Sequence, residues 1–137
     1  MGEDGARRGG TDRSTGSARK RVLRIVAVQA ATVSAAAHLL WAWPRLAGPS
    51  EPADPRPYVF VLAAAFTVVV AAATLRADEY RRLYALGAGT LAAYLVGYVA
   101  WHGGTTVAAL STDPLAIVAK TAEIVGAVAF GALYRLP

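Results

Sequence analysis

The chain has 137 residues, of which 55% are hydrophobic, a formal net charge of +5 and no cysteine. The lack of cysteine excludes disulfides, thiolate metal sites and cysteine nucleophiles. Its apolar residues, mainly Ala and Val, fall in long blocks, and its positive charge gathers near the N-terminus. Such a pattern is typical of a topology signal beside a membrane, whereas a nucleic-acid-binding domain carries its basic residues on a folded surface. We therefore expect no nucleic-acid partner.

Residues 1–18 are rich in Gly, Arg, Ser and Thr and contain no apolar run. Such a segment buries too little surface to offset its ordering entropy, so we predict a disordered cytoplasmic tail. Residues 19–137 contain four apolar stretches, each close to the roughly 20 residues that cross a bilayer core. The pattern shows no alternation of the kind a β-barrel needs, and helices satisfy their own backbone in lipid. The sequence thus predicts an all-α, integral membrane four-helix bundle with helices at about 22–43, 58–75, 83–101 and 115–134.

The connections between these stretches are consistent with helix ends. Residues 44–57 contain five prolines and are predicted to form a non-helical loop. Residues 76–82 read as a short charged turn, and residues 102–114 as a loop that ends in Ser-Thr-Asp-Pro. In that loop Asp113 is the expected N-cap of the last helix, with Pro114 at the first helical position.

The distribution of Lys and Arg predicts the orientation. Eleven of them lie in the tail, at the start of the first helix, in the second connection and at the C-terminus, whereas only Arg45 and Arg56 lie on the opposite side. Cytoplasmic segments carry the excess of basic residues, so we expect a multi-pass protein of the cell membrane with both termini cytoplasmic. Four basic residues at the start of the first helix are expected to contact anionic lipid headgroups: Arg19, Lys20, Arg21 and Arg24.

Small residues recur at four-residue spacing in the third and fourth stretches. Such spacing lets helix backbones approach closely in lipid, so we predict tight helix packing along these faces. In the third stretch they are Gly89, Ala93 and Gly97. In the fourth they are Ala119, Ala127 and Gly131, with Glu123 at the intervening position of the same spacing.

The fourth stretch also carries two opposite charges, Lys120 and Glu123, three residues apart. Side chains at this spacing share a helix face, so the two can pair. On insertion scales the charges together cost about 5–7 kcal/mol, whereas the eight large apolar residues of the stretch return only about 2.4–4.8 kcal/mol. This helix is therefore expected to need its internal ion pair, or partners on the other helices, to stay in a membrane.

Depth in the membrane suggests those partners. His38 lies about 7 Å to the outer side of the midpoint of the first helix, and Lys120 lies to the same side in the last helix. Tyr94 lies just outside the midplane and Thr67 close to it. We predict an intramembrane polar cluster of His38, Lys120, Glu123 and Tyr94, with Gln29 and Thr67 as candidate outer members.

Several roles are open to this cluster. Lys120 and Glu123 can form a purely structural latch, with the Lys120 ammonium snorkelling outward. The same residue types serve proton or ion relays, and they can also form the polar end of a site for a quinone, a lipid or another small apolar ligand. Haem held by His38 and His102 is disfavoured, because the two differ in depth and His102 lies at a helix end. No residue pattern reaches catalytic or metal-binding specificity, so we expect no catalytic residue, metal or cofactor.

Three segments resemble the small, uncharacterised four-helix membrane proteins common in haloarchaea: AAHLLWAWPRLAG, RRLYALGAGTLAAYLVGYVAW and DPLAIVAKTAEIVGAVAFGALY. In those proteins a His near the outer end of the first helix recurs together with an apolar-Lys-x-x-(Glu or Gln) pattern in the fourth. The resemblance spans about residues 22–134 and implies that His38, Lys120 and Glu123 match these positions. It implies no activity. The basic, Gly-rich tail differs from the acidic surfaces expected of halophiles.

The favoured function is a non-enzymatic membrane protein, an accessory or assembly component whose polar cluster is mainly structural. Its expected partners are the lipid bilayer and, as candidates, a second copy of the chain or a larger membrane complex. One alternative is a small proton- or ion-coupled transporter or channel that uses the cluster. A further alternative is a membrane redox subunit that binds a quinone or a lipid.

Overall fold

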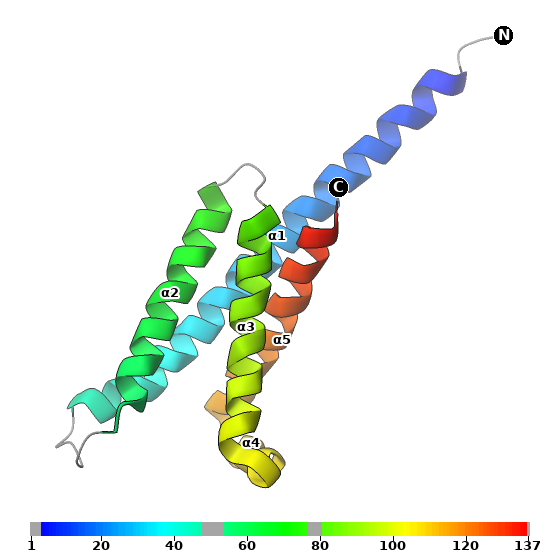
Figure 1. Ribbon diagram of the computed structural model, residues 1–137. Coiled ribbons are helices and arrows are strands. Elements are labelled where there is room, and N and C mark those ends of the chain that lie inside the picture. The colour runs from blue at the N-terminus through cyan, green and yellow to red at the C-terminus, as the bar shows by residue number, and fades with distance from the viewer. Residues whose placement is uncertain (1–3, 48–53, 77–80, 137) are drawn as a thin grey trace.

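The computed structural model describes residues 4–47, 54–76 and 81–136, with side chains from Gly16 to Leu46 in the first range. All regular structure in these residues is helical (Figure 1). The elements are α1 (Asp4–Ala47), α2 (Arg56–Arg76), α3 (Arg81–His102), the 3-10 turn η1 (Gly103–Thr105), α4 (Thr106–Thr112) and α5 (Pro114–Arg135).

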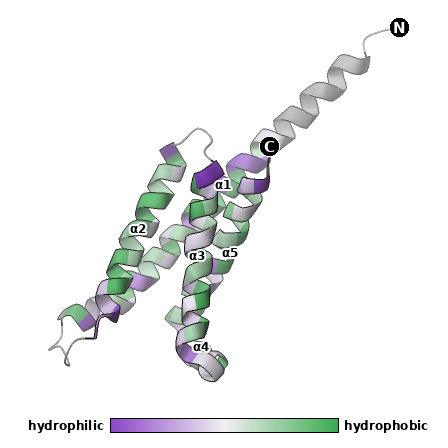
Figure 2. Cartoon of the chain, viewed as in Figure 1, coloured by the Kyte–Doolittle hydropathy of each residue, from purple (hydrophilic) through white to green (hydrophobic). Residues whose placement is uncertain are grey.

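Four helical segments in the described part of the chain are long and apolar enough to cross a membrane. Hydrophobic residues cover most of their length, and hydrophilic residues gather toward the ends (Figure 2). This confirms the predicted all-α fold with four apolar helices. The segments are Gly16–Leu46, Arg56–Arg76, Arg81–Thr112 and Pro114–Arg135.

The first helix is longer than the sequence predicts. It extends back to Asp4, into the segment 1–18 for which we expected a disordered tail, and forward through Pro44 to Ala47. Once a helix has formed, each added residue gains one hydrogen bond at little cost, and no proline precedes Pro44 to stop it. Pro44 itself lies in the last turn, where it removes only one backbone hydrogen bond. Residues 48–53, which contain two of the five prolines, lie outside the described residues.

The connection at 102–114 is not the simple loop that we predicted. It contains η1 and the two-turn helix α4, whose sequence TVAALST has neither glycine nor proline to prevent a helix. Gly103 has a φ of +52°, in the left-handed region that glycine adopts without steric cost. The chain therefore turns at Gly103 as α3 ends and then resumes a helical path.

The start of α5 agrees with the sequence. The Asp113 carboxylate accepts hydrogen bonds from the backbone N–H groups of Leu115, at 2.9 Å, and of Ala116, at 3.2 Å. Pro114 occupies the first turn, where its missing N–H costs nothing. The predicted N-cap and the predicted helix start are both confirmed.

Helix α1 crosses the bundle and packs against both α2 and α5, while α3 packs on α5 and touches α2 more lightly (Figure 1). The buried face of α1 consists mostly of alanine. A Cβ added at Gly126 of α5 would clash with Leu91 of α3 and come within 3.2 Å of the Ala30 Cβ of α1. Glycine is therefore needed at this close contact between the three helices.

The predicted small-residue face of α3 does not form this contact. Gly89, Ala93 and Gly97 are exposed, and a Cβ added at either glycine would meet nothing within 4 Å. Inside the bundle α3 instead uses Gly87, against the Phe130 ring of α5. Four-residue spacing arises easily in an Ala-rich sequence. The buried residues of α3, Tyr84, Gly87 and Leu91, lie on nearly the opposite face of the helix.

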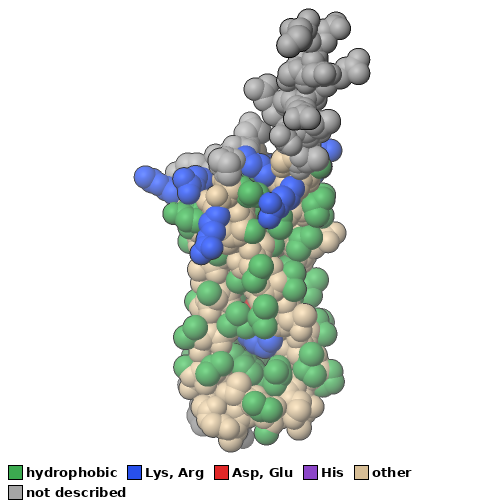
Figure 3. Space-filling model, turned by 90° about the vertical axis from the view of Figure 1, so that its right-hand side faces the viewer, with side chains coloured by type: hydrophobic (Ala, Val, Ile, Leu, Met, Phe, Trp, Pro, Cys, Tyr) green, Lys and Arg blue, Asp and Glu red, His purple; other side chains and the backbone are tan. Residues whose placement is uncertain are grey.

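Lys and Arg side chains gather at one end of the bundle (Figure 3). This end, called the basic end below, contains the N-terminal part of α1, the C-terminus of α2, the N-terminus of α3 and the C-terminus of α5 (Figure 1). Its described basic residues are Arg19, Lys20, Arg21, Arg24, Arg76, Arg81, Arg82 and Arg135.

Candidate functional site

The two charges of α5 form an ion pair inside the bundle. Lys120 Nζ lies 2.6 Å from Glu123 Oε2, and the two residues are three apart on the helix. The Glu123 side chain is 0% exposed and that of Lys120 is 13% exposed. The pair is therefore almost fully withdrawn from the surface of the chain, and its mutual attraction offsets part of the cost of burying each charge.

Helix α1 supplies partners for the other carboxylate oxygen of Glu123. Ser34 Oγ donates to Oε1 across 3.4 Å, and His38 Nε2 lies 3.9 Å from the same oxygen. Ser34 and His38 are both buried and lie four residues apart, so they share one face of α1. Glu123 thus contacts its own helix through one oxygen and α1 through the other.

The hydrogen bond from the His38 ring to the backbone fixes its tautomer. Nδ1 lies 2.8 Å from the Ser34 carbonyl oxygen, and a carbonyl only accepts, so Nδ1 carries the proton in this contact. In a neutral His38 the lone pair on Nε2 then faces the Glu123 carboxylate. A proton placed between Nε2 and Oε1 would convert this juxtaposition into an attraction.

Tyr94 of α3 and Thr67 of α2 complete the cluster. The Tyr94 hydroxyl lies 2.8 Å from the Ala63 carbonyl oxygen and 2.7 Å from Thr67 Oγ1, which itself lies 2.9 Å from the same carbonyl. Two hydroxyl hydrogens serve these three contacts, so one hydroxyl donates to Ala63 and the other to its neighbour. The Tyr94 ring contacts the His38 ring, with centroids 4.9 Å apart, and Lys120 Nζ donates to the Tyr94 carbonyl at 3.4 Å.

Aromatic side chains enclose the cluster. Phe60 of α2 packs edge-on against the His38 ring at 5.1 Å and against Trp41 at 4.6 Å. Lys120 Nζ lies 4.9 Å from the centroid of the Tyr98 ring, a cation–π distance. The ammonium therefore has a carboxylate, a carbonyl and an aromatic face as partners. No buried side-chain nitrogen or oxygen within the described ranges lacks a hydrogen-bond partner.

The structure thus brings together five of the residues that the sequence singles out: His38, Thr67, Tyr94, Lys120 and Glu123. It does not bring in Gln29, which is exposed on α1. Sequence reasoning missed Ser34, Phe60 and Tyr98. The spacing of Ser34 four residues before His38 was a usable signal, because it places the two on one helix face.

His102 lies apart from the cluster at the end of α3. Its ring stacks on Tyr98 at 4.2 Å, and its Nδ1 lies 3.0 Å from the Tyr98 carbonyl oxygen. Neither contact joins His102 to the polar cluster, so the structure places it outside the cluster that contains His38. Nor do the described His, Asp and Glu residues form any group of three arranged to hold a metal ion.

The four basic residues predicted to meet lipid headgroups lie at the basic end in different environments. Arg19 and Arg21 are exposed, whereas Lys20 and Arg24 are half-buried. Arg24 Nε donates to the Thr74 carbonyl oxygen at 2.6 Å and so links α1 to the last turn of α2.

The opposite end of the bundle carries a separate ion pair before α2. Arg56 lies 2.6 Å from Asp54 and donates to it from both its side chain and its backbone N–H. These hydrogen bonds hold the pKa of the Asp54 carboxyl below its ordinary value. The Arg56 guanidinium also lies 5.2 Å from the Trp101 ring of α3.

Comparisons of the chain with protein-family models, curated proteins and solved structures find no match.

Proposed function

We propose that the chain is a multi-pass integral protein of the cell membrane with both termini on the cytoplasmic side. Four apolar helical segments supply the spans. The charge asymmetry supports the orientation, because eleven Lys and Arg residues belong to the basic end and its tail and only Arg45 and Arg56 to the other end.

Within this membrane protein the polar cluster acts as a structural latch, and the chain serves as a non-enzymatic accessory or assembly component. The observation that carries this proposal is the environment of Glu123. Its side chain is fully buried, Lys120 occupies one carboxylate oxygen, and Ser34 and His38 face the other. A carboxylate held in this way ties α5 to α1 more readily than it exchanges with a passing ion.

The latch also explains how α5 tolerates its charges. By itself α5 is a poor membrane segment, because its two charges cost more than its apolar residues return. Beside α1 and α3 the same charges meet Ser34, His38 and the Tyr94 carbonyl. Polar contacts between helices in lipid contribute about 0.6 kcal/mol each on average, so several together make the bundle specific for one arrangement.

A Glu123→Gln variant tests the latch, because it keeps the shape of the side chain and removes its charge. We expect a lower folded yield in detergent, measured by size-exclusion chromatography of a fluorescent fusion. Thr121→Val, at an exposed position on the same helix, is the matched control and should keep the parental yield. A Glu123→Gln protein that folds as well as the parent but loses a pH-driven proton flux in proteoliposomes would overturn the latch in favour of a relay.

A small proton-coupled transporter is the second candidate, and the geometry of His38 favours it. Its Nε2 lone pair faces Glu123 Oε1 at 3.9 Å, so the pair can accept one additional proton between two buried atoms. Under this proposal a His38→Gln variant folds normally and loses proton flux. The third candidate, a quinone- or lipid-binding redox subunit, has no comparable support, since none of the cluster residues lines the hollow on α2 described below.

The orientation has its own test. The chain contains no cysteine, so single cysteines introduced at exposed Ser17 and Ser111 report the two sides without interference. A membrane-impermeant maleimide added to intact cells should label the Ser111→Cys variant and leave the Ser17→Cys variant unlabelled. The reverse pattern would refute the proposed topology, and recovery of the chain in a carbonate-washed supernatant would refute membrane insertion itself.

A further inference from the structure

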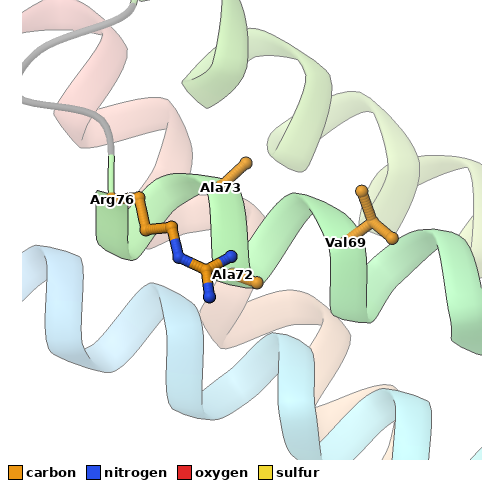
Figure 4. Close-up of a pocket in the computed structure, with 4 residues that line it drawn as sticks. All are labelled: Val69, Ala72, Ala73 and Arg76. Carbon is orange, nitrogen blue, oxygen red and sulfur yellow. The ribbon is translucent and has the colours of Figure 1, made fainter.

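An open hollow of about 530 Å³ lies on the C-terminal part of α2, close to the basic end. Four residues line it, Val69, Ala72, Ala73 and Arg76, and they occupy successive turns of one helix face (Figure 4). The two alanines form the floor, because their short side chains leave the space between Val69 and Arg76 unfilled.

The hollow is apolar along its length and cationic at one end. The Arg76 side chain is exposed and runs back along α2 toward Ala72 (Figure 4). Among the described residues no hydrogen bond or ion pair engages its guanidinium. By contrast Arg24 donates to the Thr74 carbonyl. Arg81 donates to the Tyr134 carbonyl at 3.2 Å, and its guanidinium lies 4.8 Å from the centroid of the Tyr134 ring. Arg76 is therefore available to an external anion.

The length of the hollow matches the upper part of a phospholipid. Val69 and Arg76 are seven residues apart, so they differ in depth by about 10 Å along a helix. That distance separates a phosphate at the membrane surface from the first several carbons of its acyl chain. The opposite face of α2 packs on α1 and is linked to it by the Arg24–Thr74 hydrogen bond.

The surrounding charge favours an anionic headgroup. The basic end and its connecting segments carry eleven Lys and Arg residues against five Asp and Glu residues in the sequence. A negative headgroup gains from this excess, whereas a zwitterionic one gains little. We propose that this hollow is a binding site for one anionic phospholipid, with its phosphate on Arg76 and an acyl chain over Ala72 and Ala73. This inference rests on the proposed membrane insertion.

The test titrates the purified full chain in detergent with dioleoyl phosphatidylglycerol or dioleoyl phosphatidylcholine and counts bound lipids by native mass spectrometry. We expect one phosphatidylglycerol to bind at least about five-fold more tightly than phosphatidylcholine, the scale of one interfacial cation. Arg76→Gln should abolish this preference, and Ala73→Leu should weaken binding by filling the hollow. Two controls lie at exposed positions: Arg82→Gln at the basic end and Ala65→Leu on α2. Each should change binding less than two-fold.

Equal losses in Arg76→Gln and Arg82→Gln would overturn the proposal, because they would indicate a diffuse layer of charge. So would a preference that survives in Arg76→Gln, or parental binding in Ala73→Leu. All four positions lie at or near the surface, so each variant is expected to fold. Thermal melting of each variant checks this. If the chain resists carbonate extraction and shows no preference for phosphatidylglycerol, the lipid site fails and the membrane proposal stands. If the chain is not retained by membranes, the membrane proposal itself fails.

Discussion

The interaction between Lys120 and Glu123 predicts a strong energetic coupling. Removing one member of a buried ion pair costs about 3–5 kcal/mol, because the other charge is left without its partner. Lys120→Ala leaves Glu123, at 0% exposure, with only Ser34 and His38 nearby. Glu123→Ala leaves Lys120 with the Tyr94 carbonyl at 3.4 Å and the Tyr98 ring at 4.9 Å. Each single variant should therefore lose about 3 kcal/mol or more of unfolding free energy.

The double variant should be much milder than the sum. With both charges removed, no unpaired ion is buried, and the remaining cost comes from lost contacts and lost volume. We expect the double variant to lose about 3 kcal/mol, so that the coupling energy is also about 3 kcal/mol, at the upper end of the range for residues in contact. The assay is reversible unfolding of the single chain in mixed micelles, followed by circular dichroism.

Additive losses would refute this reasoning, because they would mean that the two side chains stabilise the bundle independently. Parental stability in all three variants would refute the latch as a whole. If the alanine variants give too little folded protein, Lys120→Met and Glu123→Gln replace them, because these changes remove charge with little change in volume. The cycle built from them has the same sign and the same refuting outcome.

Three further predictions follow from individual contacts. Gly126→Leu should lose about 1–3 kcal/mol in the same unfolding assay through its clash with Leu91, whereas Gly89→Leu, at an open position, should stay within about 0.5 kcal/mol of the parent. Tyr94→Phe should lose no more than about 1 kcal/mol, because Thr67 can still donate to the Ala63 carbonyl; a larger loss would contradict the shared hydrogen bonds. Asp54 has a lowered pKa in the folded chain, so its contact with Arg56 stabilises the fold at pH values above the ordinary pKa of 3.8. This stabilisation is lost as the pH falls through the pKa of the folded state. Arg56→Gln should return the pKa of Asp54 toward 3.8 in an NMR titration, and an unchanged pKa would contradict the pairing.

The sequence predicted the helices well because their signals are local. Long apolar stretches identify candidate spans, and the Asp-Pro pair at 113–114 marks the start of α5, where the Asp113 side chain caps two backbone N–H groups. The spacing of Lys120 and Glu123 is local too, since residues three apart on any helix lie side by side. The length of α1 was predicted less well, because composition alone indicates a tail where the helix continues to Asp4.

Contacts between helices were harder to predict, because the helices are apolar on every face. Hydrophobic periodicity normally shows which face is buried, but in these Ala- and Val-rich helices it carries little information. The exposed position of Gln29 could still have been found. It lies nine residues before His38, which places the two about 180° apart around a helix, so they cannot face the same cluster. Phe60 and Tyr98 gave no comparable signal, since their contacts depend on how α2 and α3 are rotated in the bundle.

The bundle is tied at two depths by different chemistry. At the basic end, Arg24 links α1 to the last turn of α2, and Arg81 links α3 to the last turn of α5. Both arginines donate to carbonyl oxygens near a helix C-terminus, where the helix dipole favours a cation. These links join the helices only in pairs, whereas the polar cluster includes residues from α1, α2, α3 and α5. Loss of the cluster should therefore weaken the contact between the two pairs, which then depends on the apolar packing of α1 against α5. Loss of a single arginine should affect only one pair, so the Lys120–Glu123 contact matters more for the bundle than either arginine.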